Sequence, residues 1–248
     1  MNFEKDKIVE KDRYNLRAKN NFNVFQKFTI KNIPIFLRKP YEVYIDFINE
    51  NIKNNYKVLE LAAGMGEHTD FLVKTGANIT ACDISNDSLN VLKKNYKDKI
   101  KVIEADMENL PFKNDSFDIV CCAGSMSYAD QKIVCDEIFR VLKKNGKFIC
   151  VDSLNYNIIY RVNRYIHFLR GKRSKSVIRR APGKYFFRTF KENFFFEKIE
   201  YFGQITWLAP ILKRLIGVRL FTNLSNWFDK NSNLKYLSFK FVLVAKKL

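Results

Sequence analysis

The sequence predicts an α/β fold: a seven-stranded sheet with helices on both faces and helical segments inserted as lids. Short apolar runs of strand character recur through the first two thirds of the 248-residue chain, and helical patterns lie between most of them. Continuous apolar strands that alternate with helices are typical of a parallel sheet covered on both faces. The first five predicted strands are 57–62, 78–83, 100–105, 117–123 and 147–152.

The connecting segments and the last third of the chain complete this prediction. Helical patterns span 88–96 and 133–142, and "KKNG", which ends at Gly146, is a helix stop before the fifth strand. After residue 152 the pattern changes, and two further strands bring the total to seven. The late elements are an amphipathic helix over 155–169, a strand over 194–203, an aromatic and basic helical region over 207–228 and a last strand over 237–247.

We expect these elements to form one domain over 1–248, because no repeat or low-complexity segment divides the chain. The predicted parts are an N-terminal helical cap over 1–55, a core over 56–152, a basic lid over 153–193 and the last two strands with a helical insertion over 194–248.

The charge is strongly positive and unevenly distributed. The net charge is +18, and the segment 153–191 holds eleven Lys or Arg residues without a single Asp or Glu. Such a run is either a solvated face or a surface that collects an anion, such as a phosphorylated small molecule, a lipid head group or a nucleic acid.

Other features of the composition indicate a cytoplasmic protein. The five cysteines show no C-x-x-C spacing, and most fall in or beside predicted strands, as reduced core cysteines do. With two histidines, we expect no metal site. No apolar run is long enough to span a membrane, and the N-terminal residues lack the apolar segment of a secretory signal.

A glycine-containing turn follows the first predicted strand. In "VLELAAGMGEHT", Gly64 and Gly66 allow a tight turn and a close approach of the backbone to a ligand. Asp83 ends the second strand, where a carboxylate can accept both hydroxyls of a ribose. These features alone also fit a dinucleotide-binding fold, although Thr69 occupies the position of its third glycine.

Further motifs decide against a dinucleotide-binding fold. The combination of "VLELAAGMGEHT", "ACDIS", "EADMENLPFKNDSFDIV" and "EIFRVLKKNGKFICVD" resembles the glycine motif, ribose-binding strand end, adenine loop and fifth strand of class I S-adenosylmethionine-dependent methyltransferases. The resemblance covers residues 41–152 and, more loosely, the last strand. It implies a Rossmann-like seven-stranded methyltransferase sheet, with S-adenosylmethionine as cofactor and S-adenosylhomocysteine as product.

The resemblance implies a role for individual residues at the donor site. Glu60 would help to hold the methionine amino group, and the turn at Gly64 and Gly66 would meet the methionine and ribose portions. Ala62 departs from the family, which usually has a glycine there. The other implied donor contacts are Asp83 to the ribose hydroxyls, Ile84 on the adenine face, Asp106 to the adenine amino group, the Met107 amide to the ring, Ala123 beside the carboxylate, and Tyr14 and Arg38 over the methionine end.

The acceptor site is expected after the fourth and fifth strands and in the basic lid. The sequence "AGSMSYAD" lacks the Asn/Asp-Pro-Pro-aromatic motif of nucleic-acid amino-methyltransferases, which disfavours a nucleic-acid partner. The substrate-binding candidates are Ser125, Tyr128, Asn155, Arg161 and Arg164, and the candidate catalytic bases are Tyr128, Asp152 and His167.

The arginines of the lid favour a small anionic acceptor. The blocks after the fourth and fifth strands also resemble a methyltransferase subgroup found with bacterial surface-polysaccharide (O-antigen and capsule) enzymes. This resemblance implies O-methylation of a sugar, a nucleotide-linked sugar or a phosphoryl-type decoration.

Two rival interpretations remain, and the chain is expected to be a monomer or a homodimer in each. "WLAPILKRLIGVRLF", residues 207–221, mixes apolar and basic residues as interfacial helices do. It is either a lid or dimer helix, or the contact of an enzyme that methylates a lipid or quinone at the inner membrane surface. The second rival is an RNA methyltransferase, or a basic scaffold or nucleic-acid-binding protein without catalytic activity.

Overall fold

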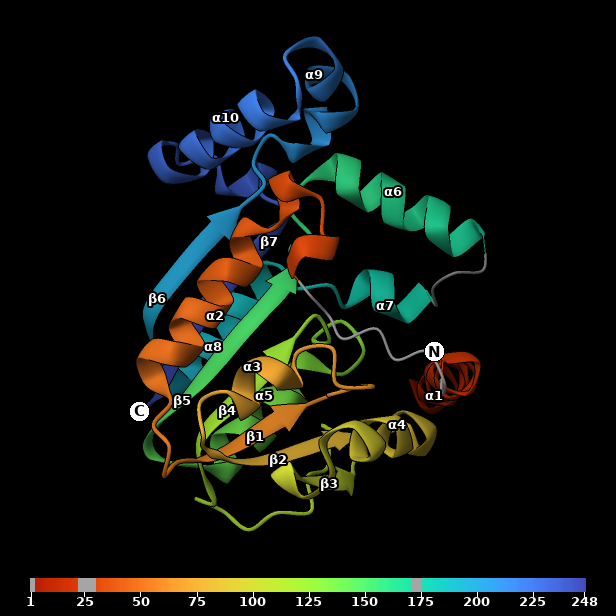
Figure 1. Ribbon diagram of the computed structural model, residues 1–248, viewed down its shortest axis with the longest axis vertical. Coiled ribbons are helices and arrows are strands. Elements are labelled where there is room, and N and C mark those ends of the chain that lie inside the picture. The colour runs from red at the N-terminus through yellow and green to blue at the C-terminus, as the bar shows by residue number, and fades with distance from the viewer. Residues whose placement is uncertain (1–2, 22–29, 171–174) are drawn as a thin grey trace.

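The structure, a computed structural model, describes residues 3–21, 30–170 and 175–248. Its centre is a seven-stranded sheet with the strand order β3-β2-β1-β4-β5-β7-β6, which confirms the predicted fold class (Figure 1). The strands are β1 (Lys57–Leu61), β2 (Asn78–Asp83), β3 (Ile100–Glu104), β4 (Phe117–Ala123), β5 (Leu142–Ser153), β6 (Phe194–Phe202) and β7 (Lys240–Lys247).

The direction of the strands places six carboxyl ends at one edge of the sheet. The strands β1 to β5 pair in parallel. The last strand, β7, lies antiparallel between β5 and β6, so β6 runs in the same direction as the first five. Segments that follow β1 to β6 therefore begin at the same edge, which is where ligands bind in open α/β sheets.

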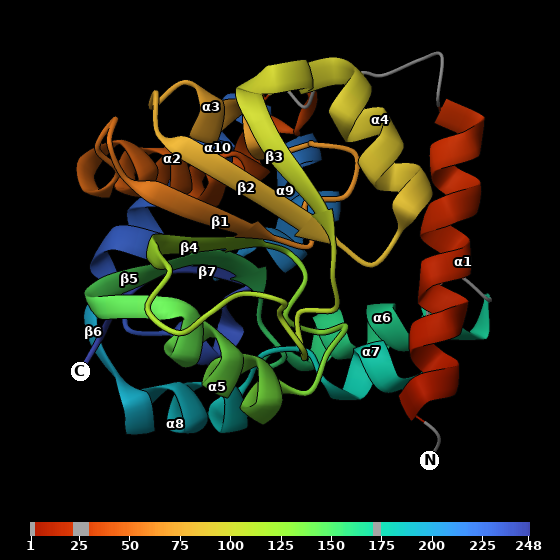
Figure 2. The ribbon, with the colours of Figure 1, turned by 90° about the horizontal axis from the view of Figure 1, so that it is seen from below.

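Helices cover both faces of the sheet (Figure 2). Helices α2, α3 and α4 pack on one face, and α5 and α8 pack on the other. The side chains of each strand alternate between these layers, as the strand periodicity requires: Val58 joins the first, whereas Leu59 joins the second. The covering helices are α2 (Lys39–Asn51), α3 (Thr69–Val73), α4 (Asn86–Tyr96), α5 (Gln131–Val141) and α8 (Lys184–Asn193).

The remaining helices gather around the carboxyl edge of the sheet. Helix α1 packs against α4 through a small cluster of Ala18, Met65 and Val91 and runs past the strand ends (Figure 2). Helices α6 and α7 follow β5, and α9 and α10 follow β6 (Figure 1). These helices are α1 (Phe3–Asn21), α6 (Ile158–Leu169), α7 (Lys175–Arg179), α9 (Ala209–Leu215) and α10 (Val218–Asn231).

Two helices of the predicted cap and lid pack against the sheet. Helix α2 lies within the predicted cap, but Tyr44, Phe47 and Ile48 are buried against the sheet. Helix α8 lies within the predicted lid, but Phe186 and Phe190 are buried in the core. Both helices therefore belong to the core of the domain.

Helix α6 is amphipathic as predicted, but its apolar face points outward. Ile158 and Leu169 are 69% and 66% exposed, whereas Arg164 is 8% exposed. The guanidinium of Arg164 donates to the Leu154 carbonyl (2.7 Å) and to Asn155 Oδ1 (3.1 Å). These bonds fix the inward face of the helix, so its apolar residues remain at the surface.

The five cysteines are all buried and free, as expected from their positions in the sequence. In the described part of the chain, no helix combines the length and the apolar character that a membrane crossing needs.

Candidate functional site

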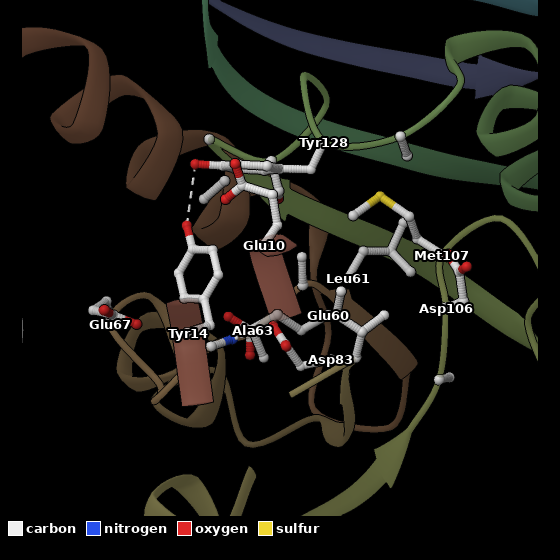
Figure 3. Close-up of a pocket in the computed structure, with 18 of the residues that line it drawn as sticks. Glu10, Tyr14, Glu60, Leu61, Ala63, Glu67, Asp83, Asp106, Met107 and Tyr128 are labelled. Carbon is white, nitrogen blue, oxygen red and sulfur yellow. Dashed lines mark hydrogen bonds between the residues drawn. The ribbon is translucent and has the colours of Figure 1, made fainter. Parts of the chain in front are cut away.

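A pocket with a volume of about 320 Å³ lies at the carboxyl ends of β1, β2, β3 and β4. Helix α1 closes one side of it, and the chain after each of these strands forms the rest (Figure 3). This volume lies at the lower end of the usual range for small-molecule sites. Of the predicted site residues, the pocket is lined by Tyr14, Glu60, Gly64, Asp83, Ile84, Asp106, Met107, Ala123, Ser125 and Tyr128.

The turn after β1 is built from left-handed backbone. Ala62 (φ 49°), Gly64 (φ 56°) and Gly66 (φ 96°) all have positive φ, so the alanine that replaces the usual glycine adopts a glycine-like conformation. Gly64 lines the pocket, but Gly66 does not. A Cβ on Gly66 would lie 2.5 Å from a Leu92 carbon, so this glycine serves the packing of α4 instead of ligand contact.

Asp83 is 9% exposed and organises this turn. Its Oδ2 accepts a hydrogen bond from the Gly64 amide (2.9 Å) and its Oδ1 accepts one from the Ser85 amide (2.8 Å). Burial raises the pKa of Asp83, and the two amide bonds oppose that rise. Each carboxylate oxygen keeps a further lone pair, so the side chain can still accept from the hydroxyls of a ribose.

Glu60 lies deeper than Asp83, at 4% exposure, and accepts a hydrogen bond from the Thr69 hydroxyl (2.6 Å). Burial raises the pKa of Glu60 to about 8, and the charges of Glu67 and Asp83 add to this rise. The side chain therefore holds a proton at neutral pH in this structure. A ligand ammonium at this end of the pocket would favour the ionised form.

The end of the pocket that the resemblance assigns to adenine is lined by Asp106, Met107 and Ile84. Lys7 of α1 lies there as well, with its Nζ 2.7 Å from Asp106 Oδ2 and 2.5 Å from Glu108 Oε2. Burial alone would lower the pKa of Lys7, but these two carboxylates outweigh it and raise that pKa. The ion pairs tie α1 to the loop that follows β3.

Helix α1 contributes more to the pocket than the sequence indicated. Lys7, Glu10, Tyr14 and Arg17 line it, and their spacing of three or four residues places them on one face of the helix. This polar stripe at helical spacing was the signal that could have found them.

The end of the pocket near Tyr128 has a different character. The Tyr14 hydroxyl donates to Tyr128 Oη (3.1 Å; Figure 3), and Arg13 donates to the same oxygen (3.4 Å). Glu10 lies beside them and pairs with Arg13 (2.5 Å). Burial raises the pKa of Tyr14, which keeps its phenol neutral. Ser125, the other predicted residue here, contacts Cys122 Sγ at 3.0 Å.

The other histidine of the chain, His68, lines the pocket, although only His167 was predicted as a base. The His68 ring stacks on Tyr41, with centroids 5.7 Å apart. Burial lowers the pKa of His68 to about 4, and the charge of Lys240 adds to this effect. The imidazole is therefore neutral at physiological pH.

Several predicted site residues lie outside the pocket lining. Asp152 is 2% exposed, and its carboxylate accepts from the Met126 amide (2.8 Å) and the Ser153 amide (2.6 Å). It holds the loop after β4 and does not reach the pocket.

The other predicted site residues that do not line the pocket are Arg38, which donates to the Ile33 and Lys31 carbonyls, Asn155 and Arg164, which bond each other, and Arg161 and His167 of α6. Their positions follow from side-chain hydrogen bonds and helix packing, which the periodicity of the sequence does not contain.

Residues 59–150 match the methyltransferase domain family. This segment is therefore similar to a methyltransferase domain. The strand order and the strand-end pocket agree with the fold that the resemblance to class I S-adenosylmethionine-dependent enzymes implied.

Two curated relatives of this domain carry names from quinone biosynthesis. A demethylmenaquinone methyltransferase of Clavibacter sepedonicus is 34% identical over 96 residues, 38% of this chain and 39% of that protein. A ubiquinone/menaquinone biosynthesis C-methyltransferase of Rickettsia prowazekii is 35% identical over 119 residues, 43% of this chain and 48% of that protein. The chain therefore spans less than half the length of these relatives, which differ from the surface-polysaccharide subgroup that the sequence suggested.

A solved structure extends the likeness over most of the chain. Geranyl diphosphate C-methyltransferase of Streptomyces coelicolor, solved with Mg²⁺, geranyl diphosphate and S-adenosyl-L-homocysteine, has a TM-score of 0.59 at 13% identity. The match covers 86% of this chain and 81% of that one. At this identity the likeness shows the fold alone.

The residues present fit S-adenosylmethionine, the cofactor that the resemblance implied. The two carboxylates of Asp83 and Asp106 lie at adjacent strand ends, where they can accept from the ribose and the adenine amino group. Gly64 brings the backbone to the same pocket, from the end of the neighbouring strand β1.

Proposed function

We propose that the chain is an S-adenosylmethionine-dependent C-methyltransferase whose acceptor is a quinol-type aromatic ring carried on a lipid. The observation that carries the methyltransferase activity is the pocket in which Asp83, Asp106 and Gly64 meet. The similarity to quinone methyltransferases supports the acceptor class. Bound S-adenosylmethionine supplies an electrophilic methyl group, so the protein has to align the acceptor and exclude water.

The hydroxyl of Tyr128 is placed to orient such a ring. Its oxygen accepts hydrogen bonds from Tyr14 and Arg13, and a hydroxyl accepts two hydrogen bonds and donates one. The Tyr128 proton is therefore left to donate to an oxygen of the acceptor. The neutral imidazole of His68 lies in the same pocket, where it offers a hydrogen-bonding group to the acceptor, although the burial that lowers its pKa opposes its full protonation.

The anionic acceptor expected from the sequence has less geometric support. It relied on Arg161 and Arg164, but no described residue of 153–191 lines the pocket. Arg164 is committed to Leu154 and Asn155. The basic segment therefore has to be explained by something other than contact with a small anion at the methyl donor.

A transfer assay with radiolabelled S-adenosylmethionine tests the acceptor class. The acceptors are a reduced demethylmenaquinone with a shortened side chain and, separately, nucleotide sugars and a glycan fraction. Label in the quinol, with the new methyl group on a ring carbon by mass spectrometry, is expected. Label only in the sugar or glycan samples would overturn the acceptor assignment and leave the methyltransferase activity in place.

Replacement of Tyr128 tests the orientation of the acceptor. Tyr128→Phe removes one hydrogen bond to the acceptor, which is worth about 1 kcal/mol, so kcat should fall about fivefold. Affinity for S-adenosylhomocysteine, measured by calorimetry, should stay unchanged. Tyr156→Phe, at a half-buried tyrosine outside the pocket lining, is the matched control. An unchanged kcat in Tyr128→Phe contradicts the proposed role.

A further inference from the structure

We propose that helices α6, α9 and α10 form a docking face for the surface of an anionic lipid bilayer. This docking face consists of the exposed side chains of 158–170 and 211–227. Thirteen of the twenty-three exposed large hydrophobic residues in the described chain lie in α6 and 211–227. They include Val162 (54%), Leu215 (73%), Leu220 (63%) and Trp227 (58%).

The docking face is one connected part of the molecule. Tyr160 of α6 hydrogen-bonds Thr206, just before α9, and Asn157 donates to the Leu237 carbonyl after α10 (2.9 Å). Phe221 anchors α10 on the body of the protein with 0% exposure and packs on Phe36. The three helices lie together at one end of the structure (Figure 1).

The docking face and the pocket share one edge of the sheet. Helix α6 follows β5, and α9 and α10 follow β6, whose carboxyl ends lie on the same side as those of β1, β2 and β4. A bilayer bound to this face would therefore lie at the edge of the sheet on which the methyltransferase site opens. A soluble acceptor would gain nothing from this arrangement, whereas an acceptor dissolved in the bilayer would be presented to the enzyme.

The charge of the docking face identifies the lipid. Within the docking face no acidic residue occurs, and the exposed basic residues are Arg161, Arg170, Lys213, Arg214 and Arg219. The acid that follows the docking face in the sequence is Asp229. The carboxylate of Asp229 accepts from the amides of Gly203 (2.9 Å) and Gln204 (3.0 Å), so it is turned toward the protein. Exposed basic residues beside exposed aliphatic and Trp side chains are typical of helices that bind anionic membrane surfaces.

Two other occupants fit the docking face less well. Nucleic acid would complement the charge, but exposed Leu and Ile side chains offer it neither hydrogen bonds nor stacking. A second copy of the chain could cover the apolar residues, but it would bring basic residues against basic residues. The combination of apolar and basic side chains favours the bilayer.

Vesicle co-sedimentation tests this proposal with the full chain and without a methyl donor or acceptor. Vesicles of phosphatidylcholine are compared with vesicles that also contain phosphatidylglycerol. We expect binding to the anionic vesicles that weakens as salt is raised. The double variant Leu215→Glu/Leu220→Glu should bind them at least roughly tenfold more weakly. Ile133→Glu, at a residue of α5 that is 45% exposed, is the matched control and should bind as wild type.

Affinity of each variant for S-adenosylhomocysteine verifies that it is folded. Failure of the wild type to bind vesicles, equal binding to both compositions, or an equal loss in Ile133→Glu would overturn the proposal. So would a wild-type dimer, in sedimentation equilibrium, that Leu215→Glu/Leu220→Glu converts to monomer. Because vesicle binding is measured separately from methyl transfer, a failure here is distinguishable from a failure of the proposed function.

Discussion

Replacement of Gly66 by alanine should destabilise the protein through packing as well as backbone strain. Gly66 has φ 96°, and an added Cβ would lie 2.5 Å from Leu92 Cδ1 and 2.8 Å from Tyr96 Cε2. Both neighbours are buried on α4. A left-handed conformation costs an alanine about 1–2 kcal/mol, and overpacking of a core costs about 1–3 kcal/mol more. The expected loss of unfolding free energy is therefore about 2–5 kcal/mol.

Thermal unfolding measures this loss, since a domain of this size loses about 2–4 °C in Tm per kcal/mol. The matched control is Gly217→Ala: Gly217 has φ 82°, but nothing lies within 4 Å of an added Cβ. It should lose only about 1–2 kcal/mol, the backbone contribution. Equal melting temperatures for the two variants would refute the packing argument.

Donor affinity separates packing from ligand contact in the same variants. Because Gly66 does not line the pocket, calorimetry with S-adenosylhomocysteine well below both melting temperatures should find little change in Gly66→Ala. A large loss of affinity in a variant that is fully folded would mean that Gly66 meets the ligand directly.

Two further predictions concern stability. Lys97 is exposed, with φ 46° and ψ −125°, a conformation that glycine adopts without strain. Lys97→Gly should therefore raise the unfolding free energy by about 1 kcal/mol, whereas the control Lys99→Gly should not. A lower Tm for Lys97→Gly than for the wild type would contradict this prediction. Glu60 has a pKa of about 8 in the folded protein against an ordinary value of 4.5, so the carboxyl takes up a proton on folding between these pH values. The contribution of the protonated carboxyl to the free energy of unfolding is complete below pH 4.5 and is lost as pH rises through 8. The Tm of Glu60→Gln relative to wild type should therefore increase between these pH values, and a constant difference would show that Glu60 titrates normally.

The sequence by itself determined the sheet and the donor half of the pocket. Parallel strands end at one edge, so any residue that directly follows a strand is placed by the strand pattern alone. This is why Glu60, Asp83 and Asp106 could be assigned to one site before the structure was known, and all three line the pocket. The same reasoning put Asp152 at this edge but could not foresee that its carboxylate is used by two backbone amides.

Only the tertiary structure decided which face of each covering helix points inward. The amphipathic pattern of α6 shows that the helix has two faces, but the inward face is fixed by Arg164, whose partners Leu154 and Asn155 lie in the loop after β5. Likewise, α1 reaches the pocket through contacts such as Lys7 to Asp106, which are 99 residues apart. Periodicity reports the local geometry along one helix. The inward face of each helix also depends on which groups of other segments pair with its charged side chains.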